Sequence, residues 1–203
     1  MKIAIIGCGY VGKAVAHHWH NKLGYVITAT TTTLGRVAEL ETLAHEVIVL
    51  KGDDANTLTS AIQNQDVVLL SVGAANGTVY EETYLGTAKT LVAALKQTST
   101  VKQVIYTGSY AVYGDKRGDW VDEDSPVTPA NQNGEILAET EQVLLAASNP
   151  NLKVCIFRLG GIYGPGRELI KIFGRAAGTT RPGAGEDFTN WIHLRDIVGA
   201  LTF

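Results

Sequence analysis

The sequence has little of what marks membrane, secreted or nucleic-acid-binding proteins. No apolar run approaches the roughly 18 residues that cross a bilayer, and the first run, Ile3–Ile6, is too short for a signal peptide. The net charge is only -3, with no excess of Lys and Arg to attract nucleic acid. Two cysteines are present, Cys8 and Cys155, and we expect both to be reduced thiols. We therefore expect a cytoplasmic protein that binds small molecules, with neither nucleic acid nor membrane as a partner.

Short apolar runs alternate with helix-length segments along most of the chain. Continuous apolar character is typical of strands buried on both faces of a sheet, and intervening helices imply right-handed crossovers between parallel strands. We predict an α/β fold of the Rossmann type, a doubly wound parallel sheet. The predicted strands are Ile3–Ile6, Val26–Ala29, Glu46–Leu50, Asp66–Val72, Gln103–Thr107 and Val154–Leu159. The predicted helices are Val11–Asn21, Arg36–Leu43, Thr57–Gln63, Tyr80–Lys96 and Gly134–Ala147.

The first predicted strand runs directly into a glycine motif, Gly7-Cys8-Gly9-Tyr10-Val11-Gly12. This pattern is weak alone, but between a strand and a helix it is typical of dinucleotide binding. There, Gly7 permits a tight turn, Gly9 admits the pyrophosphate to the backbone, and Gly12 lets helix and strand pack closely. The helix N-terminus attracts phosphates. We predict that all six residues form a dinucleotide site; the alternative is a glycine-tightened turn without this ligand.

The end of the second strand favours NADP over NAD. NAD sites usually carry Asp or Glu about 20 residues beyond the glycine turn, to hold the ribose 2′-hydroxyl. Here the strand ends in threonines, and Arg36 begins the next helix. Hydroxyls and a guanidinium suit a 2′-phosphate, which a carboxylate would repel. We expect Thr31, Thr32 and Arg36 to bind it, unless the threonines are merely a β-branched strand end.

Two further strand ends offer cofactor contacts, because ligands of open α/β sheets lie at the carboxyl ends of strands. Asp53 follows the third strand and is a candidate for the adenine amino group, although it reads almost equally well as a turn residue. Ser71, Val72 and Gly73 follow the fourth strand, and we expect them to line the ribose.

The sequence changes character beyond Leu159, where Gly and Pro recur and a short helix is predicted near Glu168–Ala177. We divide the chain into a dinucleotide-binding Rossmann domain, residues 1–159, and a contiguous partial substrate-binding region, residues 160–203. The last residues, 198–203, are apolar and carry no helix cap. We expect this second region to be incomplete.

Five segments together give a more specific resemblance. They are Ile6–Gly12, Tyr106–Gly114, Trp120–Glu123, Phe157–Arg167 and Asn190–His193. With them the chain resembles the extended short-chain dehydrogenase/reductase superfamily, in particular the NAD-dependent epimerase/dehydratase family and its atypical YeeZ-like branch. The resemblance covers essentially the whole chain. It implies NAD(P) binding and oxidoreductase or epimerase chemistry on a small carbonyl or hydroxyl substrate.

Active members of that superfamily use a Ser or Thr, a Tyr, and a Lys four residues after the Tyr. Ser109 matches the first of these. The resemblance places Asn133 at the Tyr position and Leu137 at the Lys position, and no tyrosine in the chain has a lysine four residues later. An adjacent ammonium normally favours the phenolate of a group that titrates near 10. The chain therefore departs from the superfamily pattern at the two residues that carry out proton transfer in active members.

Three tyrosines are candidate substitutes for that pair. Tyr110 and Tyr113 lie beside Ser109, and Tyr163 belongs to a loop that could cover the nicotinamide, although such aromatic residues usually pack. One hypothesis is an NADP-dependent oxidoreductase or epimerase with an unusual proton donor. The other is a non-catalytic NADP-binding sensor or regulatory protein. No metal site is expected, the substrate is unknown, and the oligomeric state stays open.

Overall fold

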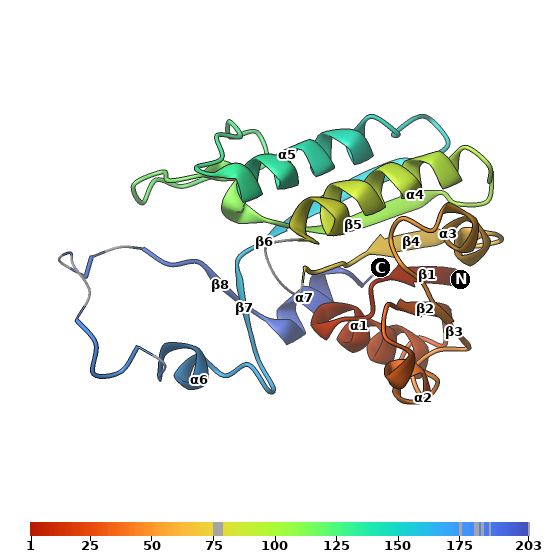
Figure 1. Cartoon of the computed structure of the whole chain (residues 1–203), viewed down its shortest axis with the longest axis horizontal. Helices are drawn as coiled ribbons and strands as arrows, with labels where there is room; N and C mark the ends of the chain where they lie inside the picture. The colour runs from red at the N-terminus through yellow and green to blue at the C-terminus, as the bar shows by residue number, and fades with distance from the viewer. Residues whose placement is uncertain (75–78, 175, 181–182, 184, 187, 203) are drawn as a thin grey trace.

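The computed structural model describes residues 1–74, 79–174, 176–180, 183, 185–186 and 188–202. Its main sheet is formed by β1 (Lys2–Ile6), β2 (Val26–Thr31), β3 (Glu46–Val49), β4 (Val67–Leu70), β5 (Gln103–Ser109) and β6 (Lys153–Leu159). These six strands are all parallel and lie in the order β3-β2-β1-β4-β5-β6 (Figure 1). The predicted doubly wound α/β sheet is confirmed.

Helices cover both faces of this sheet (Figure 1). One face carries α1 (Tyr10–Asn21), α2 (Val37–Leu40) and α7 (Leu194–Ala200); the other carries α3 (Ala55–Ile62), α4 (Thr87–Leu95) and α5 (Gln132–Leu145). A π-helical turn, Glu82–Gly86, leads into α4. Within the described ranges, no helix has the length and apolar character needed to cross a bilayer.

The two faces of β1 explain the continuous apolar strands of the sequence. Ile3 and Ile5 pack into the core beneath α1, where Trp19 is fully buried. Ala4 and Ile6 pack into the opposite core, which α3 and α4 cover. Each fully buried aliphatic side chain contributes about 1.5–3 kcal/mol to stability. A central strand with no solvent face therefore has no place for alternating polar residues.

Strand β2 is longer than the predicted strand, which stopped at Ala29. The structure extends β2 to Thr31 because Thr30 and Thr31 pair with Ile48 and Val49 of β3. Both threonines are buried, at 2% and 5% exposure. Threonine is β-branched and suits a pleated surface, so the same residues that suggested a ligand site also continue the strand.

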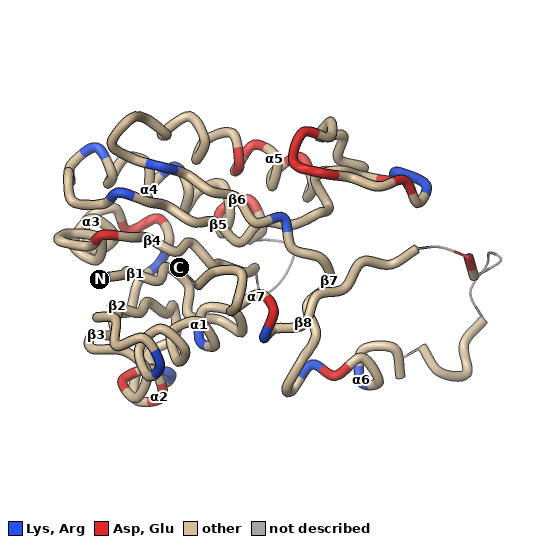
Figure 2. The backbone as a smooth tube through the Cα atoms, turned by 180° about the vertical axis from the view of Figure 1, so that it is seen from behind, with Lys and Arg blue, Asp and Glu red and all other residues tan. Residues whose placement is uncertain are grey.

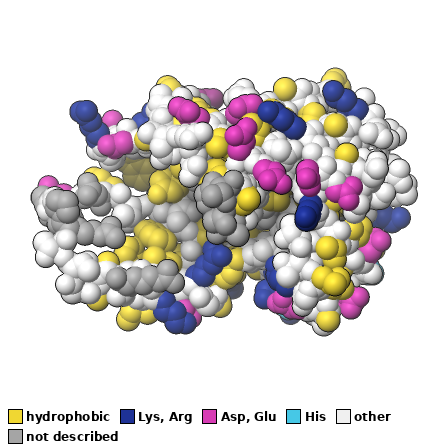
Figure 3. All heavy atoms as spheres, viewed as in Figure 1, with side chains coloured by type: hydrophobic (Ala, Val, Ile, Leu, Met, Phe, Trp, Pro, Cys, Tyr) yellow, Lys and Arg dark blue, Asp and Glu magenta, His cyan; other side chains and the backbone are white. Residues whose placement is uncertain are grey.

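The chain beyond β6 forms a smaller unit with β7 (Gly161–Tyr163) and β8 (Trp191–His193), a two-stranded parallel sheet, and the short α6 (Leu169–Gly174). Figure 2 shows this unit projecting away from the main sheet. Apolar side chains gather over it in the space-filling view (Figure 3). Helix α7 then returns to the main sheet, where Ile197 is buried in the core beneath α1. Residue 175 of the predicted helix Glu168–Ala177 and residues 181–182, 184 and 187 after it lie outside the described residues.

Candidate functional site

A cavity of about 870 Å³ opens at the carboxyl ends of the central strands. The loops that follow β1, β2, β4 and β5 all contribute to its walls. In the observed strand order, the chain leaves β1 towards β2 on one side, and β4 lies on the other side. This is the topological switch point at which open α/β sheets bind their ligands.

The glycine turn forms part of the wall of this cavity, and its three glycines differ in their surroundings. Gly7 has φ +94°, and a Cβ there would lie 2.6 Å from the carbonyl oxygen of Ser71. A Cβ on Gly12 would collide with the carbonyl oxygen of Gly7. Gly9 lines the cavity, and a Cβ there would meet nothing within 4 Å. Gly7 and Gly12 therefore serve the backbone geometry, whereas Gly9 leaves space open to a ligand.

Strand β2 fixes the position of the turn. The amide of Gly7 donates a 2.9 Å hydrogen bond to the hydroxyl of Thr30, and the amide of Cys8 donates a 2.8 Å bond to the Thr30 carbonyl. Helix α1 then begins without a side-chain cap and without an acidic residue in its first turn. Gly9, Tyr10 and Val11 line the cavity at that point. Uncapped N–H groups and the helix dipole make this helix start suited to a phosphate.

Cys8 lines the cavity, but its thiol is unreactive. Its side chain is 1% exposed, and burial raises the pKa of the thiol to about 12, against the smaller opposing effects of Arg36 and a Thr30 backbone hydrogen bond. The thiol therefore stays protonated at neutral pH. Since only a thiolate is a good nucleophile or metal ligand, Cys8 is a packing residue of the turn.

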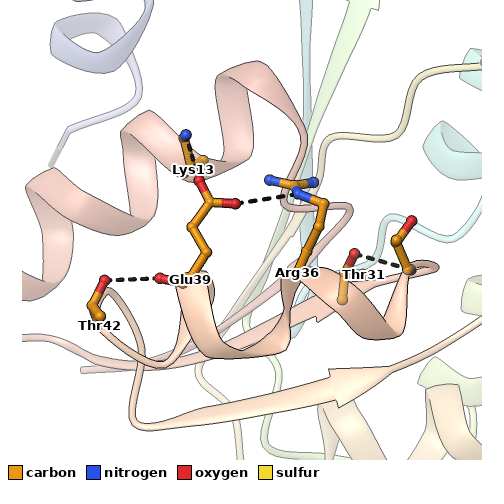
Figure 4. Close-up of polar contacts among 6 residues, drawn as sticks. Lys13, Thr31, Arg36, Glu39 and Thr42 are labelled. Atoms are coloured by element: carbon orange, nitrogen blue, oxygen red, sulfur yellow. Dashed lines mark hydrogen bonds and ion pairs between the residues drawn. The ribbon is translucent and has the colours of Figure 1, made fainter.

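Lys13 and Arg36 both bind the Glu39 carboxylate at the corner of the site beside β2 (Figure 4). Arg36 lines the cavity, and its Nε atom lies 3.4 Å from the Glu39 carboxylate. The same carboxylate binds Lys13 of α1 at 2.7 Å, and this contact, with the charge of Lys13, holds the pKa of Glu39 below its usual range. Two cations share one anion here. This corner therefore keeps a net positive charge beside Thr31 and Thr32, which also line the cavity.

The residues predicted to contact the cofactor after β3 and after β4 differ in whether they line the cavity. Ser71, Val72 and Gly73 line the cavity, and the Ser71 hydroxyl accepts a 3.1 Å bond from Thr107. Asp53 does not line it, contrary to our expectation. The chain passes so close to α4 at Gly52 that a Cβ there would collide with Thr87. Lys51 and Gly52 therefore line the cavity, and the exposed Asp53 follows outside it.

Ser109 lies at the end of β5 and lines the cavity. Its hydroxyl oxygen accepts a 3.2 Å bond from the amide of Ala111, which leaves the hydroxyl proton free to be donated. Tyr110 follows it but is 42% exposed and lies outside the cavity lining. Tyr163 also lies outside the lining, where its ring packs against His193 at 5.0 Å. Ser109 thus lines the cavity, whereas Tyr110 and Tyr163 do not.

Tyr113, which we predicted as a candidate catalytic residue, is instead buried in a hydrogen-bond network. It is 7% exposed, and its hydroxyl accepts a 2.8 Å bond from Arg158 while donating a 2.7 Å bond to the Asp122 carbonyl. Arg158 in turn binds the buried carboxylate of Glu141 at 2.9 Å. This network links β6, α5 and the loop around Asp122. A hydroxyl with both partners satisfied inside such a network does not face a substrate.

The two positions that depart from the family pattern lie at the start of α5. Leu137, which the sequence resemblance places at the Lys position, lines the cavity and is 3% exposed. Asn133 lies in the first turn of α5 and does not line the cavity. The cations among the described lining residues are Arg36, Lys51 and Arg167.

Among the cavity residues that sequence reasoning missed are Tyr80 and Tyr84, which pack against the same cluster as Leu137. Their ring centroids are 4.6 Å apart. Burial, reinforced by the proximity of Tyr84 and a hydrogen bond to it, raises the pKa of Tyr80. Both belong to the segment that enters the π-helical turn before α4, a feature often found at functional sites. The two tyrosines are four residues apart in a predicted helix, and this spacing could have indicated that they lie on the same helix face.

The strand order and the glycine turn at the switch point define a Rossmann-type nucleotide-binding fold. The model of the NAD dependent epimerase/dehydratase family matches residues 3–203, and the chain belongs to this family. Protein YeeZ of Escherichia coli K12 is 32% identical over 207 residues, which cover 99% of this chain and 72% of that protein. These findings confirm the family resemblance predicted from the sequence motifs.

Solved structures share the fold. UDP-glucuronic acid 4-epimerase from Bacillus cereus, in complex with UDP-glucuronic acid and NAD, superposes with a TM-score of 0.80 at 20% identity, covering 98% of this chain and 71% of that one. A functionally unknown conserved protein from Silicibacter pomeroyi DSS superposes with a TM-score of 0.74 at 26% identity, covering 98% and 66%. Both similarities extend through nearly the whole of this chain.

Proposed function

We propose that this protein binds NADP(H) in the cavity at the switch point. The observation that carries the proposal is the combination of an uncapped α1 start at Gly9–Val11 with the positive corner at Arg36. The first suits the pyrophosphate, and the second suits a phosphate on the ribose. The B. cereus structure, which has the same fold, contains NAD.

The charge of the cavity supports NADP over NAD. Glu82 is the one carboxylate among the described lining residues, and it belongs to the π-helical turn, not to β2. No lining carboxylate is thus available after β2 to bind the ribose hydroxyls of NAD. The carboxylate of Glu39 is engaged by Lys13 and Arg36. A 2′-phosphate would gain charge-assisted hydrogen bonds from Arg36 and from the threonine hydroxyls.

The chemistry that we propose is reduction of a small carbonyl compound. The bound cofactor would supply the hydride. Ser109 would donate a hydrogen bond from its hydroxyl to the carbonyl oxygen and keep its proton, and the Tyr80–Tyr84 pair would transfer the single proton that completes the alcohol. A phenol whose pKa is raised stays protonated near neutral pH, so it can donate a proton but serves poorly as a base. We therefore expect reduction to be faster than oxidation.

Residues 160–203 would complete the substrate side. Gly160, Ile162 and Arg167 from this region line the same cavity as the glycine turn. We therefore assign residues 1–159 to cofactor binding and residues 160–203 to a substrate-binding region contiguous with it.

A second function, binding of NADP without catalysis, is favoured by one specific observation. Leu137 places an apolar side chain in the cavity where the family carries its lysine. Without that ammonium no residue at this place lowers a tyrosine pKa. The protein would then act as a sensor or regulatory protein that responds to the cofactor.

Calorimetric titration with NADP, NADPH, NAD and NADH tests the shared part of both proposals. Failure of all four to bind would refute both. A panel of aldehydes, ketones and alcohols then separates them. NADPH oxidation that is lost in Ser109→Ala and in Tyr84→Phe supports the reductase, and binding without any turnover supports the sensor.

A further inference from the structure

Arg167 belongs to the region assigned above to the substrate side, but its contacts lie at the glycine turn. It follows the Gly-Pro-Gly turn after β7 and lines the same cavity as the glycine turn. Its guanidinium carbon lies 4.2 Å from the centre of the Tyr10 ring. Tyr10 is the first residue of α1 and follows Gly9 directly. Arg167 therefore lies over the start of α1, although more than 150 residues separate the two in sequence.

The loop that carries Arg167 is held in place on the glycine turn. The Tyr10 hydroxyl donates a 2.9 Å hydrogen bond to the Pro165 carbonyl. Residues Gly164 and Arg167 exchange two backbone hydrogen bonds, of 3.2 and 2.9 Å, which close the loop. Gly164 has φ +147°, and a Cβ there would lie 3.0 Å from the Tyr10 hydroxyl. The stacking of Arg167 on Tyr10 is thus a consequence of a docked loop.

The charge of Arg167 is not neutralised by a carboxylate in the described part of the chain. Its neighbour Glu168 is engaged elsewhere, with Lys171 at 2.8 Å and the Gly166 amide at 3.2 Å. The hydrogen bond from Lys171, together with backbone hydrogen bonds, lowers the pKa of Glu168 to about 2. The other cavity arginine, Arg36, does have a carboxylate partner. The Arg167 guanidinium and the positive end of the α1 dipole therefore both face the same part of the cavity.

We propose that Arg167 binds the pyrophosphate of the dinucleotide together with the start of α1. This inference rests on the proposed function and assigns one more residue to the same site. The stacking on Tyr10 places Arg167 beside the phosphate-binding end of α1, while Arg36 lies beyond β2 at the end assigned to the 2′-phosphate. A planar guanidinium matches the paired oxygens of a pyrophosphate, and the anion relieves the repulsion between guanidinium and helix dipole.

The two arginines then predict different binding profiles. NADPH, NADH and ADP-ribose share the pyrophosphate, and only NADPH carries the 2′-phosphate. Arg167→Met should weaken all three by a similar factor of about 10- to 100-fold, since a hydrogen bond to a charged group is lost. Arg36→Met should weaken NADPH alone. Arg195→Met removes an exposed arginine of α7 that does not line the cavity, and it should change none of the three.

Titration calorimetry of these variants with the three ligands tests the assignment, with the melting temperature of the free protein as a check on folding. Because Arg167 has no carboxylate partner, we expect Arg167→Met to melt like the wild type. Unchanged ADP-ribose affinity in Arg167→Met would overturn the assignment. Weakening of NADPH and NADH with ADP-ribose unaffected would also overturn it, because Arg167 would then serve the nicotinamide end. If the wild type binds none of the ligands, the proposed function fails first and the assignment falls with it.

Discussion

The amide of Gly7 donates a 2.9 Å hydrogen bond to the hydroxyl of Thr30, and this contact joins the glycine turn to the neighbouring strand. Thr30 is 2% exposed, so water does not compete for the bond. The position of Gly9, two residues further on, depends on this anchor. Thr30 thus acts on the candidate site through the backbone of the turn.

Thr30→Val keeps the β-branched shape and removes the hydroxyl, so the Gly7 amide loses its partner. We expect a loss of about 1–3 kcal/mol in the free energy of unfolding and a clear loss of dinucleotide affinity. Thr28→Val is the matched control, because Thr28 is another buried threonine of β2 whose hydroxyl bonds Gln65 and Glu46 away from the cavity. It should lose stability and keep its affinity. Urea unfolding and calorimetry measure both, and equal affinities in the two variants would contradict the anchoring role of Thr30.

Gly9→Ala and Gly12→Ala should have opposite effects. The space around Gly9 is open, so Gly9→Ala should fold with normal stability and bind the dinucleotide poorly, because its methyl group would occupy the place of the pyrophosphate. Gly12→Ala forces a methyl group against the Gly7 carbonyl and should lower stability by about 1–3 kcal/mol. Thermal melts and titrations on the same samples check this. Normal NADPH binding by Gly9→Ala would show that no phosphate approaches Gly9.

Glu141 and Glu139 lie two residues apart on α5 and differ sharply in burial. Glu141 is 1% exposed and pairs with Arg158, whereas both side chains of the Glu139–Lys89 pair are 56% exposed. Glu141→Ala should cost about 1.5–3 kcal/mol of stability because it removes charge-assisted hydrogen bonds from the Arg158 guanidinium, whose side chain is only 17% exposed. Glu139→Ala should cost less than about 1 kcal/mol. Comparable unfolding midpoints in urea would refute this difference.

Burial of the Cys8 thiol predicts a pH dependence of stability. Its pKa is raised to about 12, so above the ordinary thiol value the unfolded chain releases a proton that the folded chain keeps. Stability from this group is complete below that ordinary value and is lost as pH rises towards 12. The loss is about 1 kcal/mol per pH unit between pH 9 and 10.

Cys8→Ala removes this contribution to the pH dependence. The free energy of unfolding should therefore fall less steeply between pH 9 and 10 in the variant than in the wild type. Tyr106, whose pKa is also raised by burial, is present in both proteins and cancels in the comparison. Identical slopes would mean that the thiol is accessible to water in the folded protein.

The sheet was predictable because buried parallel strands need continuous apolar residues, as in Ile3–Ile6. The glycine turn was predictable because Gly7 and Gly12 meet backbone atoms that leave no room for a side chain. The tyrosines that we propose as proton donors were not predictable from their distance to Ser109 in the sequence. Tyr113 is close to Ser109 in the sequence, yet its hydroxyl accepts a hydrogen bond from Arg158, which is distant in the sequence, and its side chain is buried. Tyr80 and Tyr84 reach the cavity from the π-helical turn before α4 and the residues that precede it, and Arg167 reaches it from the loop after β7.

Calorimetric titration of the wild type and of Arg36→Ala with NADPH and NADH measures the cofactor preference on which the proposed function depends. We expect the wild type to bind NADPH about tenfold or more tightly than NADH, since a charge-assisted hydrogen bond contributes about 1.5–3 kcal/mol. We expect Arg36→Ala to lose this preference and keep its affinity for NADH. Tighter binding of NADH by the wild type, or an unchanged preference in Arg36→Ala, would contradict the assignment of this cavity to NADP.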